Sequence, residues 1–367
     1  MKKKAKRLDS VFAPGTLTAL LWIALMASTS ALLAWHLYSS GPQRAREALT
    51  DGRGEILVLT QPKAATPSKA DGTLADSSDA SMFPKQTPDS AAPTPLAPGK
   101  NQSLTVFKPD LAEQSDFGPV PKISTDGAKP WLVYSHPFTR HGSAPVIAIL
   151  VTGVGMNKQA SDLALQLPPE MSLGIAAYAP QAKSWNDAAR ALGHETLMDA
   201  PVEPMDIAQI DLGPHALLAM NSAEDNLRHM RWILSRAPGS LGVDFSATER
   251  LSATQLSALP LYRFLVDHGL LLALAPGGPS ADQDTLLSQS VLPFVRADFR
   301  LDDSLSQDDI AHQLAALENL AVRRGYAFGV GRAYPITLKA LSQWSQQLDK
   351  KGIILAPVSA LARMKFS

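Results

Sequence analysis

Four ionisable side chains flank a short apolar run, Thr196-Leu197-Met198, and form the densest such group at any predicted strand end. His194 and Glu195 precede the run, and Asp199 and Glu203 follow it. Paired carboxylates are suited to general acid and base work, because one can donate a proton while the other accepts one. The alternative is that these are solvated loop residues held by the prolines beside them, and the spacing leaves both interpretations open.

Other polar residues follow further predicted strands, and we regard them as candidates for catalysis or ligand binding: Thr152, Asp244, Ser246, Asp302 and Arg332. Arg332 could hold an anion or serve as the structural partner of a carboxylate. Gly153 and Gly155 form a Gly-x-Gly after a strand, but no third glycine follows at the dinucleotide-binding spacing. This segment therefore predicts a tight turn.

Metal and thiol chemistry find little support in the residue types. The chain has no cysteine, which excludes a disulfide scaffold, a thiolate zinc site, an iron–sulfur cluster and a cysteine nucleophile. No two histidines lie four apart on a predicted helix, whereas a catalytic zinc needs three protein ligands. Gly-x-Ser-x-Gly is also absent. We expect no metal and no cofactor.

Strand-like and helix-like segments alternate through the C-terminal two thirds of the chain. The apolar run at 146–151 is typical of a strand buried on both faces. We expect further strands at 172–176, 196–198, 241–244, 270–274, 294–295, 326–330 and 353–356, with helices at 158–167, 185–192, 222–235, 252–268, 306–324 and 337–350. Strands separated by helices imply parallel βαβ units, here about seven of them. We predict an α/β fold with a barrel-like sheet and a site at the carboxyl ends of its strands.

The N-terminus resembles a membrane anchor. Residues 1–15 are basic, and 16–38 contain no charged residue and are long enough to span a bilayer. Basic residues before the span place it with the N-terminus in the cytoplasm and the C-terminal domain in the periplasm, as a single-pass inner-membrane protein. A cleaved signal peptide and a buried core helix are the alternatives, although the run is long for the first.

A linker and one globular domain follow the predicted anchor. Residues 39–117 are rich in Pro, Ser and Ala, a composition that cannot bury enough apolar surface to fold. We expect a flexible periplasmic linker there and a single domain over 118–367. Lys and Arg together number 34 and Asp and Glu together also 34, so the chain is not a generally basic nucleic-acid binder.

The order of several short motifs resembles the divergent polysaccharide deacetylase family, a branch of the carbohydrate deacetylase superfamily with a deformed β/α barrel. The motifs are Gly118-Pro-Val-Pro121, Ala191-Leu-Gly193-His194-Glu195, Pro201-Val-Glu203-Pro204, Leu301-Asp302 and Pro357-Val358-Ser359. The resemblance covers roughly 118–358 and implies carbohydrate metabolism as the broad process.

The metal-site motifs of that family are replaced in this chain. The resemblance implies an Asp-Asp pair where Thr152 and Gly153 stand, a histidine at Ser246, and a Gly-His-Pro whose histidine is Arg332. The superfamily uses an Asp and two His to hold a divalent metal, and a second Asp as base. The substitutions lead us to expect no metal-dependent deacetylation.

Three functions remain open. The first is an envelope protein that binds a glycan or a protein partner through these positions: Thr152, Ser246, Asp302 and Arg332. The second is an active deacetylase or hydrolase with a site rebuilt from these residues: His194, Glu195, Asp199, Glu203 and Asp244. The third is a non-catalytic scaffold held away from the membrane by the linker.

Overall fold

The computed structural model describes residues 92–93, 103–140, 142–203, 211–245, 255–274, 276–277, 287 and 290–366. The anchor predicted at 16–38, most of the predicted linker, and Ser246 lie outside these residues. Among the helices that are described, none combines the length and hydropathy needed to cross a bilayer.

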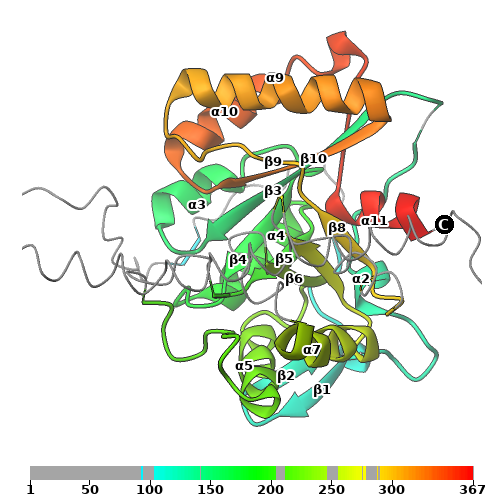
Figure 1. The fold of residues 1–367 in the computed structure, drawn as a ribbon, viewed down its shortest axis with the longest axis vertical. Helices are drawn as coiled ribbons and strands as arrows, with labels where there is room; N and C mark the ends of the chain where they lie inside the picture. Colours follow the sequence, from blue (N-terminus) through cyan, green and yellow to red (C-terminus); the bar gives the residue numbers. More distant parts are fainter. Residues whose placement is uncertain are drawn as a thin grey trace, which may run out of the picture. The chain divides into compact units, whose positions relative to one another are not determined.

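A parallel sheet forms the centre of the fold (Figure 1). Its strands are β3 (Val146–Val154), β4 (Ser172–Ala176), β5 (Thr196–Asp199), β6 (Gly242–Phe245), β7 (Leu271–Leu274), β8 (Phe294–Arg296), β9 (Phe299–Arg300), β10 (Tyr326–Arg332) and β11 (Ile354–Ala356). They are hydrogen-bonded in the order β8-β7-β6-β5-β4-β3-β10-β9, and β11 pairs with β3. The predicted α/β class is confirmed, with strands at the predicted places.

The sheet is curled because one chain segment, which contains β8 and β9, pairs with β7 near one edge and with β10 near the other. Only Ala297 and Asp298 separate β8, which pairs with β7, from β9, which pairs with β10. The N–H of Ala297 donates to the carbonyl of Leu274 (3.0 Å), and the N–H of Asp298 donates to that of Phe328 (2.7 Å). The result is a barrel-like sheet with a seam where the segment passes from β7 to β10.

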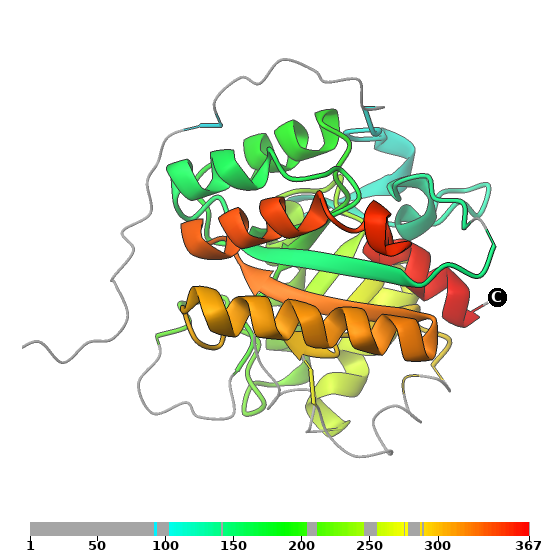
Figure 2. The same cartoon turned by 90° about the horizontal axis from the view of Figure 1, so that it is seen from above.

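Helices cover the outside of the curled sheet. They are α3 (Lys158–Ala164), α4 (Ala182–Ala191), α5 (Ala223–Ser235), α7 (Gln255–Asp267), α9 (Gln307–Arg324) and α10 (Pro335–Ser345). Figures 1 and 2 show α9 and α10 lying along β10 and β3. Figure 1 shows α5 and α7 on the opposite side of the molecule, beyond β6. As predicted, Ser222 caps α5 by accepting a hydrogen bond from the N–H of Asp225 (3.0 Å).

Two groups of buried apolar side chains lie on the two faces of the sheet. Alternate residues of β3, such as Ile149 and Val151, pack with the outer helices, whereas Ala148 and Leu150 face inward. The inner group also contains Leu361 of α11 (Val358–Phe366), and it includes Trp131 of the short α2 (Pro130–Val133). These two helices therefore fill the amino-terminal end of the barrel.

The ordered structure starts earlier than the boundary expected at 118. Strand β1 (Ala112–Ser115) pairs with β2 (Gly118–Pro121) in an antiparallel hairpin, after a 3₁₀ turn at Pro109–Leu111. Leu111 is buried, and the N–H of Leu104 donates to the carbonyl of Arg190 (2.9 Å). A second 3₁₀ turn, Asp349–Lys351, precedes β11.

Candidate functional site

Asp199 and Asp244 lie side by side at the carboxyl end of the sheet. Asp199 is the last residue of β5 and stands directly opposite Asp244 of β6 in the parallel register. Neighbouring strands are about 4.8 Å apart, so the two carboxyl groups start from adjacent backbone positions. Leu197, two residues before Asp199, faces inward, and residues two apart share a face. Both aspartates therefore point to the inside of the barrel.

The two carboxyl groups cannot ionise independently. Asp244 is fully buried, and Asp199 is half-buried with its Oδ2 accepting a hydrogen bond from the N–H of Gly153 (2.9 Å). Burial and the neighbouring Asp244 raise the pKa of Asp199 to about 8, although the Gly153 N–H opposes the rise. At neutral pH the pair therefore keeps one proton, since two adjacent carboxylates repel each other.

Gly153 reaches Asp199 through an unusual backbone conformation. Its φ is +79°, in the left-handed region that glycine adopts without strain. The structure places Gly153 inside β3, at a register irregularity between Val151 and Val154, and not in the tight turn predicted after the strand. Its N–H is directed at a carboxyl group two strands away. We missed this contact from the sequence, because the Gly-x-Gly pattern alone does not say what the amide will contact.

Thr152 and Arg332 lie at the same end of the sheet. They are opposite each other in the register of β3 and β10. The buried Thr152 hydroxyl lies 3.5 Å from the carbonyl oxygen of Gly331, which is too far for a strong hydrogen bond. Thr152 thus adds a weakly engaged hydroxyl to the inner face near the carboxylates.

Arg332 and Asp302 form an ion pair. Nε of Arg332 lies 3.4 Å from Oδ1 of Asp302, its Nη2 donates to the Asp302 carbonyl, and its backbone N–H donates to Oδ2 (2.7 Å). Thr337 also donates to that oxygen (2.9 Å). Asp302 is fully buried, whereas the Arg332 side chain is 32% exposed and lies over the Tyr334 ring. Asp302 is thus a structural acceptor, and only the outer part of Arg332 can meet a ligand.

His194 and Glu195 lie at the opposite end of β5. The ring of His194 is held between the carbonyls of Met171 (2.9 Å) and Leu165 (3.3 Å), and burial lowers its pKa. Four residues of extended chain, roughly 13 Å, separate Glu195 from Asp199. The structure therefore does not bring His194 and Glu195 together with the aspartate pair.

Glu195 organises the amino-terminal end of the sheet. It accepts hydrogen bonds from the N–H of His136 (2.7 Å) and from the N–H (3.1 Å) and hydroxyl of Ser359 at the start of α11. Burial raises its pKa, and these donors partly oppose the rise. The contacts identify Glu195 as the residue that fixes α11 under the barrel.

Glu203 also binds backbone. Its Oε2 accepts a hydrogen bond from the N–H of Ala219 (2.6 Å), and the adjacent Val202 forms a β-bridge with Leu217. Glu203 is 4% exposed, so it holds the segment after β5 in place. Of the five residues predicted for a rebuilt catalytic site, the structure joins only Asp199 and Asp244.

The described residues do not fit the divalent metal of the carbohydrate deacetylases. No three His, Asp or Glu side chains converge within them. Thr152 offers a hydroxyl, Gly153 offers no side chain, and Arg332 places a cation at the third position. Two aspartates that retain one proton fall short of three anionic or imidazole ligands. These residues therefore do not supply a site for the metal of the superfamily.

Comparison with known proteins identifies the family. The sequence pattern of the divergent polysaccharide deacetylases matches residues 149–362, which is more than half of the chain. The chain belongs to this family. The match begins at β3 and ends in α11, so it covers every strand of the curled sheet.

Similar proteins come from several bacteria. An uncharacterized protein of Haemophilus influenzae is 26% identical over 209 residues, which are 56% of this chain and 72% of that protein. The uncharacterized protein YibQ of Escherichia coli K12 is 22% identical over 223 residues, 60% of this chain and 69% of YibQ. The crystal structure of ATU2773, an uncharacterized protein of Agrobacterium tumefaciens C58, matches with a TM-score of 0.63 and 30% identity, over 66% of this chain and 98% of that one.

Proposed function

We propose that this family member is an inner-membrane-anchored envelope protein that binds a glycan at the carboxyl end of its sheet, without metal-dependent deacetylation. The observation that carries the proposal is the Asp199–Asp244 pair, with one proton on two inward-facing carboxyl groups. Asp244 is fully buried, so Asp199 is the member of the pair that would meet a sugar, and its protonated carboxyl group can both donate a hydrogen bond to a hydroxyl group and accept one from it. Arg332 would contribute a further donor at the rim.

The residue types also disfavour the family's hydrolytic reaction. Deacetylation in the superfamily needs a water activated by a metal, because that ion lowers the pKa of water from 15.7 to ~7. Thr152, Gly153 and Arg332 cannot bind such an ion. The site retains the barrel and the polar residues at the strand ends but lacks the three metal ligands. Such a site is suited to binding a ligand.

Titration calorimetry on the full-length protein tests the proposal. The ligands are oligosaccharides of N-acetylglucosamine and their deacetylated forms. We expect binding that Asp199→Ala weakens at least tenfold, because alanine can neither donate nor accept a side-chain hydrogen bond. Asp187→Ala is the matched control, since Asp187 pairs with Lys183 on the surface of α4. No binding of any envelope glycan would favour the scaffold.

The membrane anchor and periplasmic location belong to the same proposal. Their support is the basic N-terminus and the uncharged segment at 16–38. A periplasm-dependent reporter enzyme fused after Ser367 should be active. Activity from a reporter that works only in the cytoplasm would contradict this topology.

A further inference from the structure

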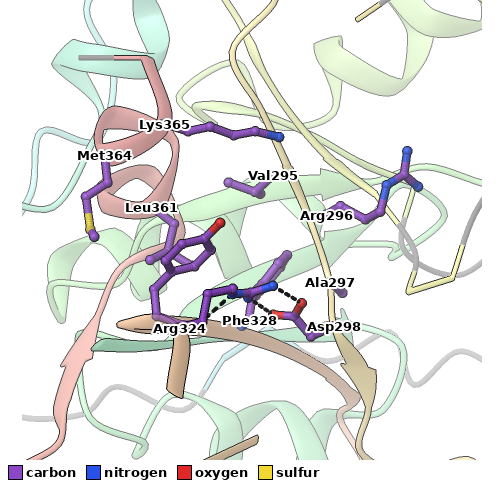
Figure 3. Close-up of a pocket in the computed structure, with 10 residues that line it drawn as sticks. Val295, Arg296, Ala297, Asp298, Arg324, Phe328, Leu361, Met364 and Lys365 are labelled. Atoms are coloured by element: carbon purple, nitrogen blue, oxygen red, sulfur yellow. Dashed lines mark hydrogen bonds and ion pairs between the residues drawn. The ribbon is translucent and has the colours of Figure 1, made fainter. Parts of the chain in front are cut away.

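A second pocket lies at the seam of the barrel, away from the aspartate pair (Figure 3). It encloses about 290 Å³ between β8, the start of β10 and α11. This volume is near the lower end of the range for small-molecule sites. Strand β8 is hydrogen-bonded to β7, and the chain first bonds to β10 at Asp298. The first part of β8 and the start of β10 are therefore left apart, and the pocket lies between them.

The walls of the seam pocket are apolar. Val295 and Phe328 belong to the inner group of buried side chains, and so does Leu361 of α11. Met364 and Tyr326 stand at its rim, each 37% exposed. A hydrocarbon or aromatic group placed here would exchange water for apolar contact on several sides.

An arginine is held in position on one side of the pocket. Arg324 forms a two-pronged ion pair with Asp298, with distances of 2.8 and 2.5 Å, and its Nε donates to the carbonyl of Tyr326 (3.1 Å). Its guanidinium lies 4.1 Å from the centre of the Tyr326 ring. These bonds account for three of the five N–H donors of an arginine, which leaves two to meet a ligand.

The lining carries more positive than negative charge. Arg324, Arg296 and Lys365 are cationic, whereas Asp298 is the acid among the lining residues. Lys365 extends from α11 across the pocket towards β8, and its ammonium lies 3.7 Å from the Phe294 ring centre. Figure 3 shows the Arg296 head group directed away from Arg324. Arg324 and Lys365 therefore come from different elements to frame the apolar walls.

We propose that the seam pocket binds a small organic acid with an apolar body. The apolar part would pack against Val295, Phe328 and Leu361, and the carboxylate would meet Arg324 and Lys365. An anion suits the two remaining N–H donors of Arg324, and an apolar body suits the walls. A ligand with only one of these features would use half of the site. This proposal is independent of the glycan site.

Octanoate is the probe, measured by calorimetry on the full-length protein. We expect octanoate to bind at least tenfold more tightly than 1-octanol, which lacks the charge, and than inorganic phosphate, which lacks the apolar chain. Met364→Trp, at the exposed rim, should weaken octanoate at least tenfold by filling the pocket. Lys365→Ala should weaken octanoate about fivefold and leave octanol unchanged.

Lys351→Ala is the control, because Lys351 is an exposed lysine paired with Glu318 outside the pocket. Val295→Phe gives a second way of filling the pocket, with circular dichroism to confirm that each variant is folded. Equal affinity for octanoate and octanol would overturn the proposal, as would octanoate binding that survives both filling variants. Flotation with phosphatidylglycerol vesicles without octanoate binding would assign this surface to lipid and also overturn it.

Discussion

Asp199 and Asp244 stand directly opposite each other on neighbouring parallel strands, with Gly153 donating a backbone N–H to the first of them. A carboxylate pair placed in this way costs free energy at neutral pH unless it retains a proton. The binding function proposed at the carboxyl end of the sheet depends on this proton, and the predictions that follow begin with it.

The stability of the protein should fall as the pH rises from 4 to 8. The pKa of Asp199 is raised in the folded state, from 3.8 to about 8, so the folded protein binds the extra proton and this contribution is lost as the pH passes the folded pKa. One pK unit corresponds to about 1.4 kcal/mol, and the half-buried position reduces the total, so we expect roughly 1–3 kcal/mol. Urea unfolding at several pH values measures it. Asp199→Asn should flatten this part of the profile; an unchanged slope would contradict the assignment.

Removing the charge of Arg332 should destabilise the fold. Arg332→Ala leaves the fully buried Asp302 without its cationic partner, although Thr337 still donates to it. We expect a loss of about 1–3 kcal/mol, less than for a fully buried pair because Arg332 is partly exposed. Thermal unfolding measures the loss. Asp302→Asn combined with Arg332→Ala should recover part of it, and a double variant no better than the single one would show that the pair is not the cause.

His194 and Glu195 should matter for stability and leave ligand binding unchanged. His194→Ala removes a ring buried between two carbonyls, and Glu195→Gln weakens the contacts that hold α11. We expect each to lower the free energy of unfolding by about 1–3 kcal/mol. Glycan affinity per folded molecule should stay within twofold of the wild type. A tenfold loss of affinity in a variant that is still folded would return these residues to the site.

Added zinc should not stabilise the protein. A ligand that binds only the folded state at 100 times its dissociation constant adds about 2.7 kcal/mol, which is a shift of several degrees in a domain of this size. Thr152, Gly153 and Arg332 offer no set of three ligands, so we expect no shift. Differential scanning fluorimetry with zinc or with a chelator measures it. Metal that survives dialysis in a stoichiometric amount would contradict the interpretation.

Much of the sheet could be predicted because its strands are buried on both faces. The first six residues of Val146–Val154 are a continuous apolar run, and every residue of Ser172–Ala176 is buried. Helices between strands carry recognisable caps, such as Ser222 before α5. The β1–β2 hairpin was missed because its first strand is short and carries Glu113 and Gln114 without an apolar alternation.

The site was harder to predict than the fold. Asp199 and Asp244 are 45 residues apart, and only the strand register places them side by side. His194 and Glu195 are close to Asp199 in the sequence, and the prediction therefore placed them in one site. An extended strand separates the residues at its two ends, so these side chains do not meet. Helix α11 was also missed, because its role under the barrel depends on Glu195, far away in the sequence.

Carboxyl-carbon NMR of the full-length protein labelled at its aspartates tests the central claim most directly. One aspartate should titrate near pH 8 in the wild type, and its midpoint should fall by more than one unit in Asp244→Asn, because the neighbouring negative charge is removed. A wild type in which every aspartate titrates below pH 5, with no change in Asp244→Asn, would contradict the retained proton and the binding function built on it.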